Sequence, residues 1–346
     1  NPLRNNMKIS FVIPYFNGKK YIIECLDSIY SQAGIVHNEF EVIIVDDCST
    51  DQESLESIRN YQQSKSNLRI VKNTQNGRCG ESRNRGLREA KGDYIWFVDQ
   101  DDYINPNCVS HLLAICQNES LDMLLFDYSI VNDDKSSNIP SKLIRGSTKT
   151  LTGLDYIQTY CEGDFWSKGY DTNVWHAIFK REFLIENNIF SPAVSYCEDM
   201  IVALHAIILA KRLLAIEETF YCYRNNANSV YHTEVGKKGR PIFDASLYAG
   251  EQMIELSELV NSDYSNLKKT IYSGGLFRLN TFCKSLLKIS REERVAFYDQ
   301  VICHKAIVDR INPYLRGWNR WLIAHPNLVI NFPKSIYILI KISEIL

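Results

Sequence analysis

Short apolar runs alternate with amphipathic stretches along the first hundred residues of the chain. Unbroken runs of aliphatic, β-branched and aromatic residues predict buried strands at 9–13, 41–45, 68–71 and 93–98. Apolar residues at helical spacing predict helices between them, at 19–32, 54–61 and 81–90. Pro14 is expected to end the first strand, since proline has no N–H to donate within a central strand. This alternation is typical of right-handed crossovers and a mostly parallel sheet.

The pattern loosens after residue 105 and then changes character. A helix at 108–117 and a strand at 123–126 continue the alternation, and a further helix is expected at 199–211. The polar stretch 132–150, rich in Ser, Asp and Lys, is interpreted as a mobile loop. Beyond about Gly236 the sequence is helical in character, with amphipathic segments at 243–260, 267–289 and 291–311. The predicted fold class is α/β with a helical C-terminal extension.

Composition and charge exclude several classes of protein. The chain has 346 residues, of which 45% are hydrophobic and 23% charged, as in globular proteins. Lys and Arg number 39 against 41 Asp and Glu, a net charge of −2 that argues against a nucleic-acid partner. No stretch approaches the roughly 18 apolar residues of a membrane-spanning helix, and no secretory signal is expected from the polar residues 1–6. We therefore expect a cytoplasmic protein whose ten cysteines, without a C-x-x-C pair, are reduced.

Polar residues directly follow three of the predicted strands. They are residues 14–17 after the first strand, Asp46 and Asp47 after the second, and Asp99, Asp101 and Asp102 after the strand at 93–98. Ligands of parallel sheets bind beyond the carboxyl ends of the strands, so these groups are expected to converge. Three carboxylates within four residues repel one another unless a cation or a cluster of donors compensates, and oxygen ligands suit Mg²⁺ or Mn²⁺. A solvated turn with an Asp cap on the next helix is the alternative interpretation.

A glycine-punctuated loop at 76–86 leads into the third helix. It offers backbone amides at a helix N-terminus and three arginines, Arg78, Arg83 and Arg85, which suit phosphate groups or a nucleotide base. No Gly-Lys-Ser/Thr sequence follows, so the loop is not a Walker A motif. The Asp46–Asp47 pair could accept a hydrogen bond from the imide N–H of a pyrimidine base.

Taken in order, these segments resemble the family 2 glycosyltransferases of the GT-A fold. The resemblance rests on Val12-Ile-Pro-Tyr-Phe-Asn17, Val45-Asp-Asp47, Asn76-Gly77 with Ser82-Arg-Asn84, and Phe97-Val-Asp-Gln-Asp-Asp102. It continues more loosely through Val174 to Arg181, Cys197-Glu-Asp199 and Tyr221-Cys-Tyr-Arg224. The resemblance implies a nucleotide-sugar-binding half at 7–104, an acceptor half at 105–235 and a helical C-terminal region at 236–346.

Carried over position by position, the resemblance implies a donor site. Its members would be Pro14, Tyr15, Asn17, Asp47, Arg83, Asp99 and Asp101. The turn 14–17 and Asp47 would hold the base and ribose, and Arg83 would assist. Asp99 and Asp101 would form the family's D-x-D signature, which touches the ribose and a Mn²⁺ or Mg²⁺ ion on the diphosphate. Asp102 follows the signature and could ligate the metal with Asp101 or in its place.

On the acceptor side, the resemblance implies an acidic pair, Glu198 and Asp199, with Asp199 as general base. A base that takes the proton of the acceptor hydroxyl permits a single in-line displacement, which inverts the anomeric centre. The alternative is an acidic helix N-terminus favoured by the helix dipole. Further phosphate or acceptor contacts are implied for Trp175, Glu198, Arg224 and His232. His176, where relatives often carry Asn, is expected to be packed or solvent-facing.

Residues 301–346 combine basic charge with aromatic surface. They hold six Lys or Arg and two acids, together with Trp318, Trp321 and the apolar stretch 336–345. Basic charge interleaved with tryptophan can bind an anionic membrane, so peripheral contact with the inner face of a membrane is one hypothesis. A helix packed on the body of the protein or in a dimer interface fits the same pattern.

Residues and resemblance together predict an inverting, metal-dependent glycosyltransferase that moves a hexosyl or hexosaminyl residue from a nucleotide diphosphate sugar, UDP-linked by preference. The resemblance adds bacterial polysaccharide assembly and a glycan or lipid-linked glycan as acceptor. A haloacid-dehalogenase-like phosphatase is the rival enzyme, because its strand also ends in Asp-x-Asp, but Tyr103 stands where Thr or Val is usual. A non-catalytic sugar-nucleotide-binding protein is the third hypothesis, and the carboxylates Asp99, Asp101 and Asp199 argue against it.

Overall fold

The computed structural model describes residues 7–134, 136–160, 173–192, 198–225 and 241–285, together with 287, 290–292, 294, 295, 298, 299, 309 and 317–337. Contacts within the chain divide it into two compact units, residues 1–226 and 227–346. The first unit carries the sheet, and the second is helical in its described part. The predicted boundary at 104/105 within the first unit stays a prediction.

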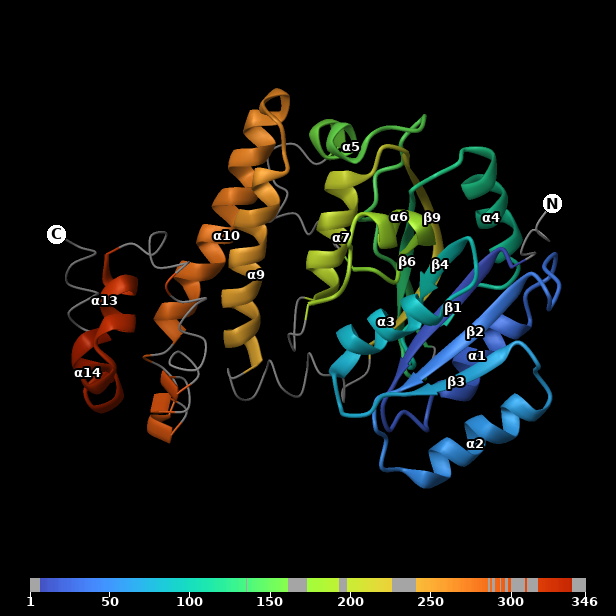
Figure 1. The fold of residues 1–346 in the computed structure, drawn as a ribbon, viewed down its shortest axis with the longest axis horizontal. Coiled ribbons are helices and arrows are strands. Elements are labelled where there is room, and N and C mark those ends of the chain that lie inside the picture. The colour runs from blue at the N-terminus through green and yellow to red at the C-terminus, as the bar shows by residue number, and fades with distance from the viewer. Residues whose placement is uncertain are drawn as a thin grey trace. The chain divides into compact units, whose positions relative to one another are not determined.

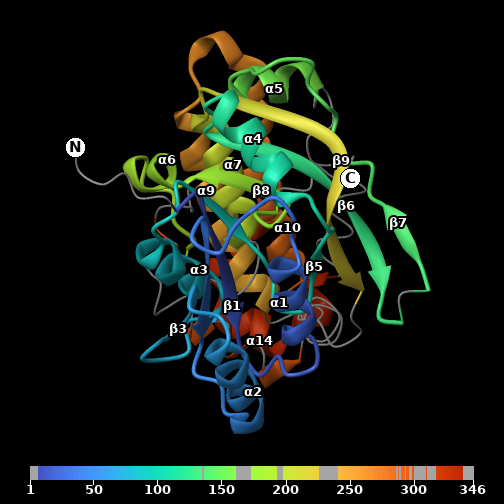
Figure 2. The ribbon, with the colours of Figure 1, turned by 90° about the vertical axis from the view of Figure 1, so that its right-hand side faces the viewer.

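A mixed sheet forms the centre of the first unit (Figure 1). Its strands in the described residues are β1 (Ile9–Tyr15), β2 (Phe40–Asp46), β3 (Leu68–Lys72), β4 (Tyr94–Phe97), β5 (Tyr103–Ile104), β6 (Met123–Asn132), β7 (Asn138–Pro140), β8 (Ala177–Lys180) and β9 (Leu213–Asn225). They lie in the order β3-β2-β1-β4-β8-β6-β9-β5, with β7 beside β6 (Figure 2). β8 is antiparallel to both β4 and β6, so β1, β2, β3, β4, β6 and β9 share one direction. The predicted α/β fold with a mixed sheet is confirmed.

Helices cover both faces of β1, which explains why its sequence is apolar without interruption. Ile9, Phe11 and Ile13 belong to a core shared with α1 (Ile22–Tyr30) and α2 (Gln52–Gln63). Val12 faces the other side, where it meets Gly86 of α3 (Arg78–Glu89). A Cβ on Gly86 would lie 2.2 Å from Val12 Cγ1, so glycine is what allows α3 to approach β1 this closely. The other helices of this unit are α4 (Val109–Asn118), α5 (Gly153–Tyr160), α6 (Arg181–Glu186) and α7 (Glu198–Leu209).

The prediction that Pro14 ends the first strand is wrong. β1 continues through Pro14 to Tyr15, with Pro14 opposite Val45 of β2. Val12 O accepts a hydrogen bond from Val98 and Tyr15 O accepts one from Asp47, so the backbone groups of β1 alternate between its two neighbours. The backbone nitrogen of Pro14 therefore points to the β4 side. It lies beyond Val12, the last residue of β1 that pairs with β4, so no N–H is required there.

The polar stretch 132–150 is more ordered than the loop interpretation implied. It contains β7, which pairs with β6 through Ile139 opposite Ile130. Farther along, the Ser147 N–H donates to Ala215 O of β9 at 2.8 Å. Pairing partners supplied by two long strands thus order a segment whose own sequence is polar.

The described part of the second unit is helical, as predicted. Its elements are α9 (Pro241–Glu258), the 3₁₀ turn η2 (Ser262–Tyr264), α10 (Ser265–Ser285), α13 (Trp318–Ala324) and α14 (Pro326–Asn331). α9 and α10 pack side by side (Figure 1), and a Cβ on Gly275 would lie 2.7 Å from the Gly250 carbonyl oxygen. Within the described ranges, none of the helices has both the length and the apolarity needed to cross a membrane.

Candidate functional site

Hydrogen bonds join three loops at the carboxyl edge of the sheet. The Phe16 N–H donates to Gln100 Oε1 at 3.0 Å, and Gln100 Nε2 donates to Phe16 O at 3.2 Å, which ties the loop after β1 to the loop after β4. The Asn17 N–H donates to Ser49 Oγ at 3.1 Å, and Asn17 Oδ1 accepts from the Thr50 N–H at 2.9 Å, which adds the loop after β2. Asn17 has φ 48°, a left-handed conformation that asparagine tolerates better than most residues. The polar strand ends predicted to converge therefore meet.

Asp47, a predicted donor-binding residue, is held by the loop that precedes α3. It is 3% exposed. Its Oδ1 accepts from the Gly77 N–H and from Asn73 Nδ2, both at 2.8 Å, and its Oδ2 accepts from the Arg78 N–H at 2.7 Å. A carboxylate has about four acceptor positions, so these three donors leave about one for a ligand. Asp47 thus shapes the glycine-punctuated loop at the start of α3.

The turn after β4 carries the acidic cluster. The Asp102 N–H donates to Asp99 O at 3.1 Å, which folds the turn back on itself. Asp102 is 2% exposed, and its two oxygens accept from the Tyr221 hydroxyl at 2.8 Å and the Arg224 N–H at 2.7 Å. Burial, together with the charges of Asp101 and Asp99, raises the pKa of Asp102 well above its usual range. Asp102 therefore faces the protein, whereas the Asp99 side chain keeps 26% of its surface exposed.

Arg83 joins carboxylates that lie far apart in the sequence. Its side chain is 4% exposed, Nη2 pairs with Asp99 Oδ1 at 2.8 Å, and Nη1 pairs with Glu198 Oε1 at 2.9 Å. Burial alone would lower the pKa of Arg83, but Asp99 and Glu198 outweigh it and raise the pKa. Among the described residues its Nε has no hydrogen-bond partner. One guanidinium thus links the end of β4 to the beginning of α7.

The acidic pair predicted for the acceptor side begins α7. Glu198 and Asp199 occupy the first turn, where the helix dipole favours negative charge. Burial and the charge of Glu198 raise the pKa of Asp199 to about 7, although Arg83 and a backbone N–H act in the opposite direction. A carboxyl with this pKa can exchange a proton at neutral pH.

Asn84 of α3 fixes the segment that leads toward α7. Its Nδ2 donates to Ser191 O at 2.8 Å, and its Oδ1 accepts from the Ser191 N–H at 2.7 Å, both in buried positions. The side-chain amide therefore pairs with a peptide group across 107 residues of sequence. A second close contact joins the same two segments, since a Cβ on Gly80 of α3 would lie only 2.9 Å from Pro192 O.

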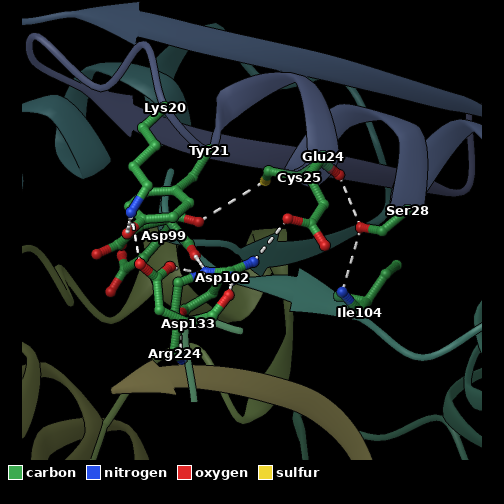
Figure 3. A network of polar contacts seen from close by, with 11 residues as sticks. Lys20, Tyr21, Glu24, Cys25, Ser28, Asp99, Asp102, Ile104, Asp133 and Arg224 are labelled. Atoms are coloured by element: carbon green, nitrogen blue, oxygen red, sulfur yellow. Dashed lines mark hydrogen bonds and ion pairs between the residues drawn. The ribbon is translucent and has the colours of Figure 1, made fainter. Parts of the chain in front are cut away.

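Arg224, for which the resemblance implied a phosphate or acceptor contact, is buried in the structure, and that contact stays a prediction. Arg224 is 2% exposed, and its Nη2 pairs with Glu24 Oε2 at 2.8 Å (Figure 3). Its Nε donates to Asp101 O at 2.8 Å. The ring of Tyr21 lies 4.6 Å from the guanidinium carbon, a cation–π distance. A guanidinium enclosed by these groups cross-links β9, α1 and the acidic turn.

Trp175, another predicted phosphate or acceptor contact, is likewise part of the core. It is 4% exposed, and its ring stacks on Tyr221 with the centroids 4.7 Å apart. His176 is packed, as one of the two expectations had it, with no exposed surface and its Nδ1 3.1 Å from Phe126 O. His232 lies outside the described residues.

The turn after β1 presents a residue that sequence analysis did not single out. Pro14 and Tyr15 lie inside the strand, and burial raises the pKa of Tyr15 to about 12. The next residue, Phe16, is 45% exposed at the edge where the strand ends converge. An exposed aromatic ring in such a place can stack on a nucleotide base. The available signal was an aromatic residue directly after the end of a buried strand.

The residues of the acidic turn fit a divalent cation that is shared with a substrate. Within the described residues, no group of three or more His, Cys, Asp or Glu side chains is arranged to hold a metal by itself. Mg²⁺ in phosphate-binding sites is commonly held by one or two carboxylates together with substrate oxygens. Burial, followed by the charges of Asp101 and Asp99, raises the pKa of Asp102, and a cation at the turn would offset the part that arises from these charges.

Comparison with known proteins gives a family and several relatives. A family model described as "Glycosyl transferase family 2" matches residues 10–183. The poly(ribitol-phosphate) beta-N-acetylglucosaminyltransferase TarS of Staphylococcus aureus is 31% identical over 219 residues, which are 63% of this chain and 35% of TarS. The uncharacterized glycosyltransferase EpsJ of Bacillus subtilis is 28% identical over 244 residues, which are 69% of this chain and 66% of EpsJ. The chain thus spans 35% of the length of TarS.

A solved structure has the same fold. The crystal structure of S. aureus TarS 1–349 in complex with UDP-GlcNAc matches with a TM-score of 0.64 and 23% identity, over 97% of this chain and 92% of that one. At this identity the likeness shows the fold alone.

Proposed function

We propose, from the premise that the chain belongs to glycosyltransferase family 2, that it moves a hexosyl or hexosaminyl residue from a nucleotide diphosphate sugar to a hydroxyl of a glycan acceptor. UDP is the preferred nucleotide, which is supported by the UDP-GlcNAc complex of TarS 1–349. Two relatives named as poly(ribitol-phosphate) sugar transferases support a glycan or polyol-phosphate acceptor.

The Arg83 bridge is the observation that carries the proposal. It brings Asp99, from the donor-side acidic turn, and Glu198, beside the candidate base, to one buried guanidinium at 2.8 and 2.9 Å. Transfer requires that a diphosphate leaving group and an acceptor hydroxyl lie at one place, with the reacting atoms in line. The unpartnered Nε of Arg83, in the part of the chain that the structure describes, adds a buried donor at this junction.

Each donor group has a residue suited to it. The exposed ring of Phe16 stacks on the base, and the remaining acceptor position of Asp47 takes its imide N–H. Asp101 and Asp99 would hold a Mn²⁺ or Mg²⁺ ion, because Asp102 is 2% exposed and faces β9, whereas the Asp99 side chain is 26% exposed. When bound, that ion neutralises negative charge on the leaving diphosphate.

Asp199 acts as general base for the acceptor hydroxyl. With a pKa of about 7 it is largely ionised at slightly alkaline pH, yet basic enough to take a proton as the new bond forms. A single displacement with one such base inverts the anomeric centre. Glu198 cannot take this role as readily, because its Oε1 is held in an ion pair with Arg83 Nη1 at 2.9 Å.

The second unit offers a surface for a lipid-linked acceptor at an anionic membrane. Its large exposed hydrophobic side chains include Leu328, Phe332 and Tyr337, at 44%, 58% and 39% exposure. Lys334 is exposed among them, and residues 301–346 hold six basic against two acidic residues. Apolar side chains with basic charge suit an anionic bilayer. Sedimentation with vesicles of anionic and of neutral lipid tests this contact, which Phe332→Ser should weaken.

A thermal-shift panel of nucleotide sugars with and without Mn²⁺, followed by transfer assays, tests the proposed function. UDP sugars should stabilise the protein by about 2.7 kcal/mol at a hundredfold excess over Kd in Mn²⁺, and less at the same concentration without the metal. Asp101→Asn should abolish this stabilisation, whereas Asp263→Asn, on the exposed turn η2, should retain it. Phosphate release from simple phosphomonoesters would favour the phosphatase instead. Metal-dependent UDP binding without transfer or donor hydrolysis would favour a non-catalytic binding protein.

A further inference from the structure

Two residues of β9 hold the acidic turn that follows β4. The Tyr221 hydroxyl accepts from the Asp99 N–H at 3.0 Å and donates to Asp102 Oδ2 at 2.8 Å. Arg224 donates its backbone N–H to Asp102 Oδ1 at 2.7 Å and its Nε–H to Asp101 O at 2.8 Å. The turn is therefore hydrogen-bonded at the backbone of Asp99 and of Asp101 and at the side chain of Asp102.

Both residues are themselves fixed by groups outside the turn. The Tyr221 ring stacks on Trp175, with the centroids 4.7 Å apart and the planes at 23°. The Arg224 guanidinium pairs with Glu24 of α1 at 2.8 Å and lies against the Tyr21 ring (Figure 3). Tyr221 and Arg224 are 0% and 2% exposed. Side chains that are buried and held on two sides form a rigid support for the turn.

This support determines which carboxylate of the turn faces inward. Asp102 is 2% exposed and directs both oxygens to β9, whereas the Asp99 side chain is 26% exposed. Adjacent negative charges repel, and a buried carboxylate without donors is strongly unfavourable. Without the two donors of β9, Asp102 would turn toward solvent, and the backbone that carries Asp99 and Asp101 would shift with it.

We propose that Tyr221 and Arg224 are positioning residues that keep Asp102 inward as an anchor and thereby hold Asp99 and Asp101 in the geometry that a diphosphate-bound divalent cation requires. The inference rests on the proposed function, because that function assigns the turn to such a cation. Mg²⁺ accepts little deviation from ideal ligand geometry, so a small displacement of the turn weakens its binding.

Replacing Tyr221 with phenylalanine removes both hydroxyl hydrogen bonds and keeps the ring on Trp175. The measurement is calorimetric titration of UDP into the full chain, once with Mn²⁺ and once with EDTA. Loss of these two hydrogen bonds should weaken UDP binding in Mn²⁺ about tenfold, and binding in EDTA less than about twofold. Arg224→Lys keeps the charge but loses the planar fork, so it should shift the Mn²⁺ titration in the same direction.

Tyr94→Phe is the matched control, because Tyr94 lies on β4 and its buried hydroxyl donates to Cys116 O at 2.8 Å, away from the turn. It should leave UDP affinity unchanged in both titrations. The proposal is overturned if Tyr221→Phe binds UDP as the wild type does in Mn²⁺, or if it loses affinity equally with and without the metal. If the wild type itself shows no metal-dependent UDP binding, the proposed function fails together with this inference.

Discussion

Replacing Asp199 with asparagine is expected to stabilise the protein above pH 7 while abolishing transfer. Folding raises the pKa of this carboxyl from 3.8 to about 7, chiefly through burial and then through the charge of Glu198. A group that holds its proton more tightly in the folded state lowers the free energy of unfolding as pH rises from about 4 to about 7. At about 1.4 kcal/mol per tenfold change in acidity, the ionised carboxylate costs up to about 4 kcal/mol of stability. Asparagine has the same shape and can still accept the Met200 N–H, so the variant loses this cost.

Urea unfolding at a series of pH values measures the effect. Wild type and variant should agree near pH 4, diverge as pH rises, and differ by about 1 to 4 kcal/mol at pH 8. The kcat for transfer should fall by about 10² to 10⁴ because the general base is lost. Asp263→Asn, on an exposed turn, serves as control and should change neither quantity. A stability difference that does not vary with pH would refute the raised pKa, and full activity of Asp199→Asn would refute its role as base.

Three further substitutions test how the site is supported, each by urea unfolding. Asp47→Asn leaves an amide N–H facing a backbone N–H of the loop before α3, which should cost about 1 to 3 kcal/mol; an unchanged midpoint would contradict that geometry. Asn84→Ala leaves the buried N–H and C=O of Ser191 without their partner, and should cost about 2 kcal/mol or more. Gly86→Ala drives a methyl group into Val12 and should cost about 1 to 3 kcal/mol, whereas a neutral result would mean that α3 does not pack on β1 as described.

The central strands could be predicted because each is an unbroken apolar run covered on both faces. β1, β2 and β4 are buried at every position, and their sequences show this directly. β5 and β7 could not be predicted in the same way, since they have two and three residues and no apolar run of their own. They are strands because β9 and β6 offer them pairing partners. Such partners come from elsewhere in the chain and leave no local pattern.

The acidic site could be predicted as a group of residues but not in its orientation. Asp99 and Asp102 carry the same side chain three positions apart, yet one is partly exposed and the other is buried. The difference arises from donors on β9 that follow Asp102 by 119 and 122 residues. The burial of Arg224 could not be predicted for the same reason, since the resemblance implied only a phosphate or acceptor contact. Its burial depends on Glu24, which precedes it by 200 residues.

Because β1, β2, β3, β4, β6 and β9 share one direction, the first unit has one rim at the carboxyl ends of these strands, where the proposed donor site lies, and an opposite rim at their amino ends. The side chains assigned to the donor lie on segments that leave strands, whereas Val36, 58% exposed, lies on a segment that enters β2 at the opposite rim. β2 has seven residues, and at about 3.3 Å per residue it separates the two rims by about 20 Å. In a variant whose exposed Cys79 has been replaced, a cysteine introduced at position 36 could therefore carry a fluorophore or a tether to a solid support while the rim that carries the proposed donor site stays open to solution.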